Sequence, residues 1–209
     1  MEIIGKLFGS EVKAKIIRLF LFNPETSYSA RDISVRTNAK GAQAASVIEG
    51  LLEVGLIRKK TAVKEIKEVK KGRSRTKKVK EALYFLDLKF PYNAIVSDLL
   101  AAASLNADDR LAAKIMPAGK VKLIIASGIF VRQNDARLDL LVVGDDMSEA
   151  KLAAIIQSLE GDIGRDLAYS SLTTADFNYR LGLHDRLIRD VIDYKHIVLT
   201  DKIGFQARK

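Results

Sequence analysis

Residues 58–80 read RKKTAVKEIKEVKKGRSRTKKVK, and the rest of the chain is best interpreted in relation to this stretch. It holds twelve Lys or Arg residues and two acids, Glu65 and Glu68, which gives a local net charge of +10. The whole chain of 209 residues carries +9, so all other residues together sum to −1. Positive charge concentrated in this way favours a polyanionic partner, most often a nucleic acid. The alternative is a solvated basic loop without a ligand, the usual state of a like-charge run.

The basic stretch has the pattern of a β-hairpin. Val63, Ile66 and Val69 alternate loosely with Lys and Glu, a turn is expected at 72–74, and residues 76–88 form the returning strand. We expect the bases of this ribbon to grip phosphates along the DNA backbone or in a minor groove, so binding should weaken steeply with salt. The bases assigned to this role are Arg58, Lys59, Lys60, Lys70, Lys71, Arg73, Arg75, Lys77 and Lys78.

Three helices are predicted before the ribbon. Residues 7–22 place apolar side chains at helical spacing, with Ser10 as the N-cap. A short helix follows over 30–37, with Ile33 and Val35 available for the core. After a turn at 38–41, a longer helix runs over 42–54, and Gly55 ends it. Its inner face consists of Ala44, Val47, Ile48, Leu51 and Leu52.

This order of helices and ribbon carries a resemblance to a known family. Residues 7–34 (LFGSEVKAKIIRLFLFNPETSYSARDIS) and 45–60 (ASVIEGLLEVGLIRKK) resemble the small winged-helix domains of prokaryotic transcription regulators. The resemblance implies that helix 42–54 lies in the major groove. Gln43 is then expected to read an adenine edge, and Lys40 or Ser46 to hold a phosphate. The helix has no arginine, so modest base discrimination is expected, and the alternative is a surface helix without a ligand.

The charge distribution divides the chain. Residues 1–90 carry twenty bases and ten acids, whereas residues 91–209 carry fifteen bases and sixteen acids. We place a domain boundary near Phe90-Pro91, with a DNA-binding domain over 1–90 and a helical linker over 91–120. Within the linker, helices are predicted over 92–105 and 108–116. Winged-helix proteins usually bind DNA as two-fold dimers, and helix 92–105 is the candidate dimer contact.

The third region, 121–209, has the pattern of an α/β domain. Strands are predicted at VKLIIASG (121–128) and RLDLLVVGDD (137–146), whose continuous apolar runs indicate burial on both faces. Asp145 and Asp146 are interpreted as a loop and N-cap before the next helix. The remaining elements are a helix over 148–163, a strand over 165–174, a long helix over 174–193 and a last strand over 196–201. The whole chain is thus predicted to be α+β with two domains, the second containing a mixed sheet.

Residues 121–201 carry a second resemblance, to the minimal nucleotidyltransferase domain. That family uses a Gly-Ser turn to hold phosphates, an Asp-x-Asp pair to bind metal ions and often a third acid on the following strand. The second Asp of the pair matches Asp139, whereas the first position is Arg137 and the third lies near Ala168. The turn is present in reversed order, as Ser127-Gly128.

These departures argue against metal-dependent catalysis. Two-metal phosphoryl transfer needs neighbouring carboxylates, and Arg137 puts a guanidinium where a cation should bind. Asp135 lies four residues from Asp139, about 13 Å along an extended strand, so it cannot replace the lost acid without a bulge. We therefore expect no enzymatic activity, no metal and no cofactor, with Ser127, Gly128, Arg137 and Asp139 as a vestigial nucleotide pocket. For Arg137 a salt bridge to Asp139 or another acid is favoured over phosphate binding.

Several classes are excluded by composition. The chain has no cysteine and only two histidines, so thiolate and histidine metal centres are not expected. No apolar run reaches membrane-spanning length and no signal peptide is recognisable, so a cytoplasmic location is expected. The predicted function is that of a non-enzymatic, dimeric, double-stranded-DNA-binding transcriptional regulator, with any small-molecule effector unidentified. The alternatives are an active, antitoxin-like nucleotidyltransferase with an autoregulatory winged helix, and an RNA-binding protein.

Overall fold

The computed structural model describes residues 3–70, 73–104, 108–131, 133 and 135–205. For residues 3, 64–70, 73–77, 101–104, 108 and 109 it describes the backbone alone. The chain forms two compact units, Met1–Ala103 with Glu160–Arg165, and Ser104–Leu159 with Asp166–Lys209. Within the described ranges, no helix combines the length and the hydropathy that a bilayer requires of a spanning segment.

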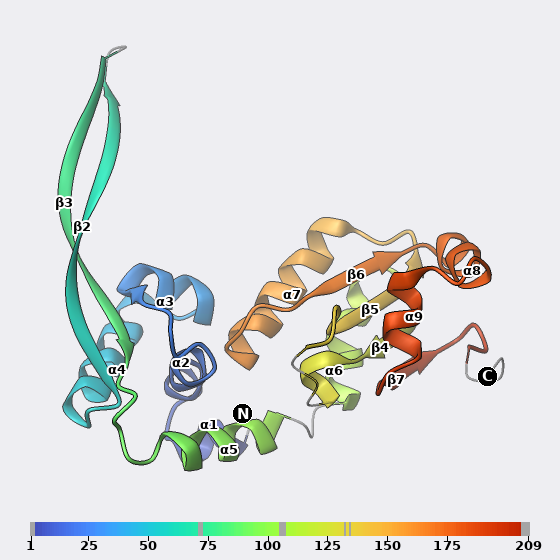
Figure 1. Ribbon diagram of the computed structural model, residues 1–209, viewed down its shortest axis with the longest axis horizontal. Coiled ribbons are helices and arrows are strands. Elements are labelled where there is room, and N and C mark those ends of the chain that lie inside the picture. Colours follow the sequence, from blue (N-terminus) through green and yellow to red (C-terminus); the bar gives the residue numbers. More distant parts are fainter. Residues whose placement is uncertain (1–2, 71–72, 105–107, 132, 134, 206–209) are drawn as a thin grey trace. The chain divides into compact units, whose positions relative to one another are not determined.

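The first unit is built of helices and one antiparallel three-stranded sheet of order β1-β3-β2 (Figure 1). Its elements follow in the order α1 (Ile3–Leu7), α2 (Glu11–Leu21), β1 (Tyr28–Ser29), α3 (Ala30–Thr37), α4 (Gly41–Glu53), β2 (Ile57–Lys70), β3 (Arg73–Leu86) and α5 (Asn93–Ser104). The unit thus extends past Phe90 and includes α5 up to Ala103.

The helices of the first unit begin at residues that the sequence marks. Ser10 Oγ accepts a hydrogen bond from the Lys13 amide, which confirms Ser10 as the N-cap of α2. The helix predicted over 7–22 is nevertheless interrupted, because Gly9 has a φ of 75° and separates α1 from α2. At α3, Ser29 and Asp32 form a reciprocal capping box.

One core residue was predicted wrongly. Ile33 is fully buried in α3, but Val35 is 57% exposed. α3 has eight residues and buries Ile33 and Thr37, which are four positions apart on one helix face. Val35 lies two positions from each, about 200° around the helix axis, and therefore faces away from the core.

Residues 160–165, which comprise the end of α7 and the two residues after it, complete the first unit. Arg18 is 2% exposed, and its guanidinium donates from Nη1 to the carbonyl of Asp162 over 2.8 Å. Asn23 Nδ2 donates to the carbonyls of Leu19 and Gly164, over 2.8 and 2.6 Å. Gly164 has a φ of 87°, and a Cβ there would lie 2.7 Å from Arg18 Cβ, so only glycine fits at this position.

The second unit is built around a mixed sheet of order β6-β5-β4-β7, which confirms the predicted mixed sheet. β4 is antiparallel to both β5 and β7, and β5 is parallel to β6. β4 and β5 are buried over most of their length, as their apolar runs predicted. The elements are α6 (Asp108–Ile115), β4 (Lys120–Ala126), β5 (Leu140–Asp145), α7 (Glu149–Ile163), β6 (Tyr169–Leu172), α8 (Thr174–Gly182), α9 (Arg186–Ile192) and β7 (Ile197–Asp201).

The single helix predicted over 174–193 is wrong, because α8 and α9 are separate. His184 adopts a left-handed backbone with a φ of 54°, which ends α8. Asp185 then starts α9 as its N-cap, with Oδ1 accepting from the Leu187 amide over 3.0 Å. The apolar periodicity of the stretch continues across this break and gives no sign of it.

Candidate nucleic-acid interface

α4 exposes the residues that the sequence assigned to base and phosphate contacts. Lys40, Gln43 and Ser46 are all exposed and follow one another three positions apart, on one side of the helix. The opposite side buries Ala44, Ile48 and Leu51 in the core of the first unit. Within its own bounds α4 contains two charged residues, both acids, Glu49 and Glu53. Within its bounds the helix therefore supplies no positive charge.

The turn before α4 is set by backbone geometry. Asn38 has a φ of 51°, a left-handed conformation that asparagine tolerates better than most residues, and it ends α3. α4 begins three residues later, with Lys40 as its N-cap residue. The two helices therefore follow one another through a short turn, which fixes the exposed side of α4 relative to α3.

Two exposed arginines of α3 were missed by the sequence analysis. Arg31 and Arg36 are both exposed, and the Arg36 guanidinium lies over the Tyr28 ring, 5.6 Å from its centroid. Helical periodicity could have identified these two arginines as exposed. An eight-residue helix that buries Ile33 and Thr37 leaves its bases facing outward.

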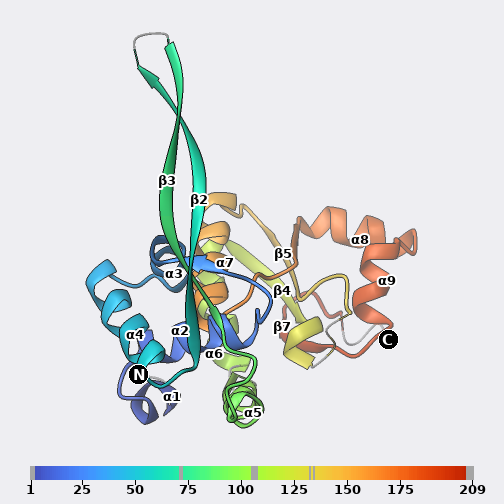
Figure 2. The same cartoon turned by 60° about the vertical axis from the view of Figure 1, so that its left-hand side comes forward.

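β2 and β3 form the predicted ribbon, in continuous antiparallel register from Ile57↔Leu86 to Lys70↔Arg73. At the base of the ribbon, Ile57 and Leu86 are 1% and 5% exposed and join the core of the unit. β1 adds a third strand there, pairing Tyr28 with Tyr84. In Figures 1 and 2 the rest of the ribbon extends away from the helices of its own unit. This extended part, residues 61–82, is termed the arm.

Three basic residues lie where the ribbon begins, and all three are exposed. Two of them, Arg58 and Lys60, contact other side chains of the chain. Arg58 Nε lies 2.7 Å from Asp87 Oδ2. The Lys89 amide and the Arg58 guanidinium keep the pKa of the Asp87 carboxyl below its usual value. Lys60 Nζ lies over the Phe85 ring, 5.3 Å from its centroid, while Lys59 is exposed. Of the nine basic residues assigned to phosphate contacts, these three thus lie at the surface near the start of the ribbon.

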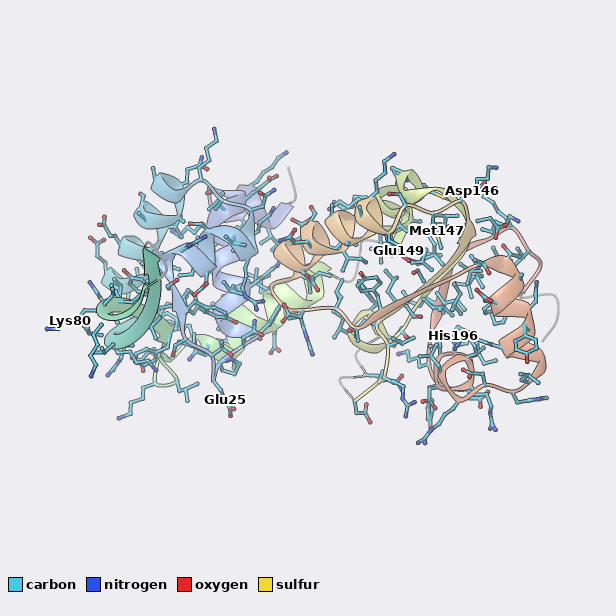
Figure 3. All side chains as sticks on the ribbon, turned by 90° about the horizontal axis from the view of Figure 1, so that it is seen from above. Glu25, Lys80, Asp146, Met147, Glu149 and His196 are labelled. Carbon is cyan, nitrogen blue, oxygen red and sulfur yellow. The ribbon has the colours of Figure 1, made fainter. Side chains whose placement is uncertain are left out.

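The distal bases lie on the arm. Lys78 is exposed, and so is Lys80, which points outward from the ribbon in Figure 3. Lys71 lies outside the described residues. The strand positions of four further bases are described without their side chains; these are Lys70, Arg73, Arg75 and Lys77.

Three residues of the predicted vestigial pocket meet in the second unit. Pairing of Ala126 with Leu140 brings Ser127 and Gly128 beside Asp139. Ser127 Oγ donates to the Leu138 carbonyl over 2.7 Å. Asp139 is 7% exposed, and each of its carboxylate oxygens accepts one backbone amide, Oδ1 from Ile129 and Oδ2 from Ala168, both over 2.9 Å. The carboxylate thus ties β5 to the segment after β4 and to the residue before β6.

Arg137 does not join this group. Its Nε lies 3.0 Å from Oδ2 of Asp190 in α9, so the favoured prediction of a salt bridge is confirmed, with Asp190 rather than Asp139 as the partner. Ala168, at the position of the family's third acid, contributes its backbone amide. Among the residues that the structure describes, no three His, Asp or Glu side chains are grouped as a metal ion would require.

Asp145 belongs to a polar cluster that the sequence did not reveal. Its carboxylate accepts hydrogen bonds from Lys122 Nζ over 2.7 Å and from the amide and hydroxyl of Thr174, both over 3.0 Å. The Lys122 bond, followed by those from Thr174, lowers the pKa of Asp145 to about 2. Asp145 was interpreted as part of a loop and cap before α7, but it ends β5 and binds the start of α8. Its neighbour Asp146 does lie in the loop before α7 (Figure 3).

The described residues therefore offer two contrasting groups of polar side chains. On the first unit, polar and basic residues of α4 and the ribbon lie at the surface. On the second, the polar residues of the predicted pocket bond to their own chain. Comparison of the chain with protein-family models, with curated proteins and with solved structures found no match.

Proposed function

We propose that the chain is a cytoplasmic DNA-binding protein, a transcriptional regulator that contacts duplex DNA with a winged helix-turn-helix. The observation that carries the proposal is the position of the charge excess. A ribbon of two 14-residue strands holds it, and the ribbon follows directly after a helix with an exposed polar side. α2, α3 and α4 followed by this ribbon have the order of a winged helix, in which the second helix of the pair enters the major groove.

The two parts of the interface divide the work of binding. α4 supplies Gln43 for a base edge and Ser46 for a phosphate, and it has no Lys or Arg within its bounds. It therefore contributes selectivity and little electrostatic attraction. The arm supplies the positive charge, which acts on phosphates without regard to sequence. Lys40, Arg31 and Arg36 are exposed as well and are proposed as further phosphate contacts.

The second unit is proposed to be a nucleotidyltransferase-like domain without catalytic function, serving dimerisation, ligand sensing or partner docking. Asp139 supports this because both of its oxygens already accept backbone amides, which leaves the carboxylate poorly placed to bind metal ions. Arg137 supports it as well, since its guanidinium is engaged by Asp190.

A two-fold dimer is part of the proposal, with α5 as the contact. The helix buries Leu100 completely, while Ile95 is 68% exposed and Leu99 41% exposed. Its one charged residue is Asp98. Replacing Ile95 and Leu99 with Gln should shift the chain from dimer to monomer in analytical ultracentrifugation. A dimer that survives both substitutions would move the contact elsewhere.

The proposal is tested by the salt dependence of DNA binding. Six phosphate contacts imply a slope of about −5 for log K against log salt, which is roughly a thousandfold loss of affinity between 50 and 200 mM. Replacing the six distal bases with Ala should remove this contribution of about 5 from the slope measured in fluorescence anisotropy titrations, leaving only the part due to the other exposed bases. The six are Lys70, Lys71, Arg73, Arg75, Lys77 and Lys78.

A matched control removes the same charge from the second unit. Six exposed bases are available there for replacement with Ala: Arg110, Lys114, Lys151, Arg186, Lys195 and Lys202. This variant should keep the slope of the parent chain. An arm variant whose slope equals that of the parent would show that the arm is not the phosphate contact, and a parent chain that binds no duplex would remove the proposal altogether.

A further inference from the structure

The arm is anchored only at its base. β1 consists of residues 28 and 29 and pairs with Leu83 and Tyr84 of β3. Beyond the Lys60↔Leu83 pair, the described sheet contains β2 and β3 alone. An isolated two-stranded ribbon is marginally stable in water, so this part of the chain contributes little to the stability of the folded unit.

The arm is about as long as one helical turn of DNA. Ten residue steps separate the Lys60↔Leu83 pair from the Lys70↔Arg73 pair. At about 3.3 Å for each step, less the shortening caused by twist, this part reaches about 30 Å from its anchor. One turn of a B-form duplex rises about 34 Å. In both Figure 1 and Figure 2 the arm twists without a sharp bend.

Charge is distributed unevenly between the two strands. Within the arm, residues 61–70 of β2 hold three bases and two acids, whereas residues 73–82 of β3 hold five bases and one acid, Glu81. The register sets Glu65 opposite Lys78 and Glu68 opposite Arg75, so the acids of β2 compensate part of the charge of β3. At the far end Lys70 is directly opposite Arg73, a like-charge pair that is unfavourable without a polyanion.

The bases of β3 are spread along most of the arm. From Arg73 to Lys80 there are seven residue steps, about 23 Å along the strand, and five bases. One DNA strand presents a phosphate for each 3.4 Å or so of helix axis, so phosphates are available along all of this length. A straight rod touches a cylinder along its whole length only when it lies nearly parallel to the cylinder axis. The arm meets that condition by lying along the duplex.

We propose, on the basis of the DNA-binding function above, that the arm lies along the duplex and extends the bound site by nearly one helical turn beyond the groove occupied by α4. The bases on one face of the arm contact the phosphates, while Glu65 and Glu68 of β2 lower the net charge of the arm. A single copy of the chain therefore protects a longer and more asymmetric site than α4 and a short wing would.

The test shortens the arm without changing its register. Deleting residues 62–65 and 78–81 removes four complete cross-strand pairs, keeps the alternation of side chains and lowers the net charge by one. The arm then loses about 13 Å, the rise of about four base pairs. Lys151→Gln, at an exposed residue of the second unit, removes the same net charge with the arm at full length and is the matched control. The probe is a duplex selected from a random library by the full-length chain.

Hydroxyl-radical footprints give the readout. The shortened arm should withdraw protection by about four base pairs at one end of the site, while Lys151→Gln leaves the footprint length unchanged. An unchanged footprint with the shortened arm, or an equal withdrawal with Lys151→Gln, overturns the inference and leaves the proposed function intact. If no duplex is selected at all, the proposed function itself fails.

A second variant covers the case in which shortening disturbs folding, which thermal melting followed by circular dichroism would reveal. Replacing Lys70, Lys71 and Arg73 with Gln keeps the length of the arm. It should remove protection at the outermost few base pairs only. Loss of protection throughout the site, or nowhere, contradicts an arm that lies along the duplex.

Discussion

The arm of the first unit and the polar group around Asp139 in the second unit use charge in opposite ways. Around Asp139 each charged or polar side chain bonds to its own chain, and the carboxylate is almost fully buried. In the arm the bases outnumber the acids, the last cross-strand pair joins Lys70 to Arg73, and Lys78 and Lys80 are exposed. Polar groups that bond within the chain stabilise its fold, whereas a surface excess of one sign of charge favours an external partner of the opposite sign.

This contrast can be tested first at Asp139. In the parent chain two backbone amides donate to the Asp139 carboxylate. In Asp139→Asn the side-chain amide group would face one of these donors, so one buried hydrogen bond is lost. We expect a loss of about 1–3 kcal/mol in the free energy of unfolding, measured by urea denaturation. DNA affinity of the folded fraction should not change.

The matched control is Arg137→Gln, which removes the ion pair with Asp190. The side chains of that pair are 48% and 27% exposed, so its loss should cost no more than about 1 kcal/mol. The opposite interpretation of Asp139 has its own signature. Incorporation of labelled nucleotide with Mn²⁺ by the parent chain, absent in Asp139→Asn, would establish an active nucleotidyltransferase.

A second test of the contrast is at Gln43. Gln43→Ala removes the side chain proposed to read a base edge and leaves the arm intact. Affinity for the selected duplex should fall by about 1–3 kcal/mol, with the salt slope unchanged. Affinity for unrelated duplex should stay the same, which isothermal titration at two salt concentrations would show. An equal loss on both duplexes would place Gln43 among the phosphate contacts.

The smallest expected effect concerns Asp145. Its pKa is lowered in the folded chain, so the stabilisation is present above the pKa of the unfolded chain, about 4, and is lost as the pH falls toward about 2. Asp145→Asn should therefore lower the melting temperature at pH 7 and flatten its dependence on pH between 4 and 2. Glu149→Gln, on an exposed residue nearby, is the control. Identical melting curves at pH 7 and pH 3 for parent and Asp145→Asn would contradict this assignment.

Local signals explain what the sequence could predict of the fold. Ser10 marks the start of α2, Gly55 has the positive φ expected after α4, and the apolar runs of β4 and β5 are buried. Such features depend on a few neighbouring residues. The break at His184 was missed because the apolar pattern runs through it and the left-handed position holds neither asparagine nor glycine.

The candidate sites were predictable to different degrees. Exposure of Lys40, Gln43 and Ser46 follows from helical periodicity, and the ribbon from its charge and turn residues. The partner of Arg137 was not predictable, because Asp190 is distant in sequence and approaches only through α9. The cluster of Asp145 with Lys122 and Thr174 likewise joins three separate elements. Long-range pairing of this kind leaves no periodic trace in a single sequence.

Residues 160–165 have a consequence for biosynthesis. The carbonyls of Asp162 and Gly164 accept hydrogen bonds from Arg18 and Asn23. Asp162 and Gly164 nevertheless belong to a segment that is synthesised after residues 104–159. At about 5–20 residues each second, a ribosome needs about 3–11 s to translate those intervening 56 positions. During that interval the nascent N-terminal unit lacks residues 160–165. It therefore cannot complete its folding before most of the polypeptide has left the exit tunnel.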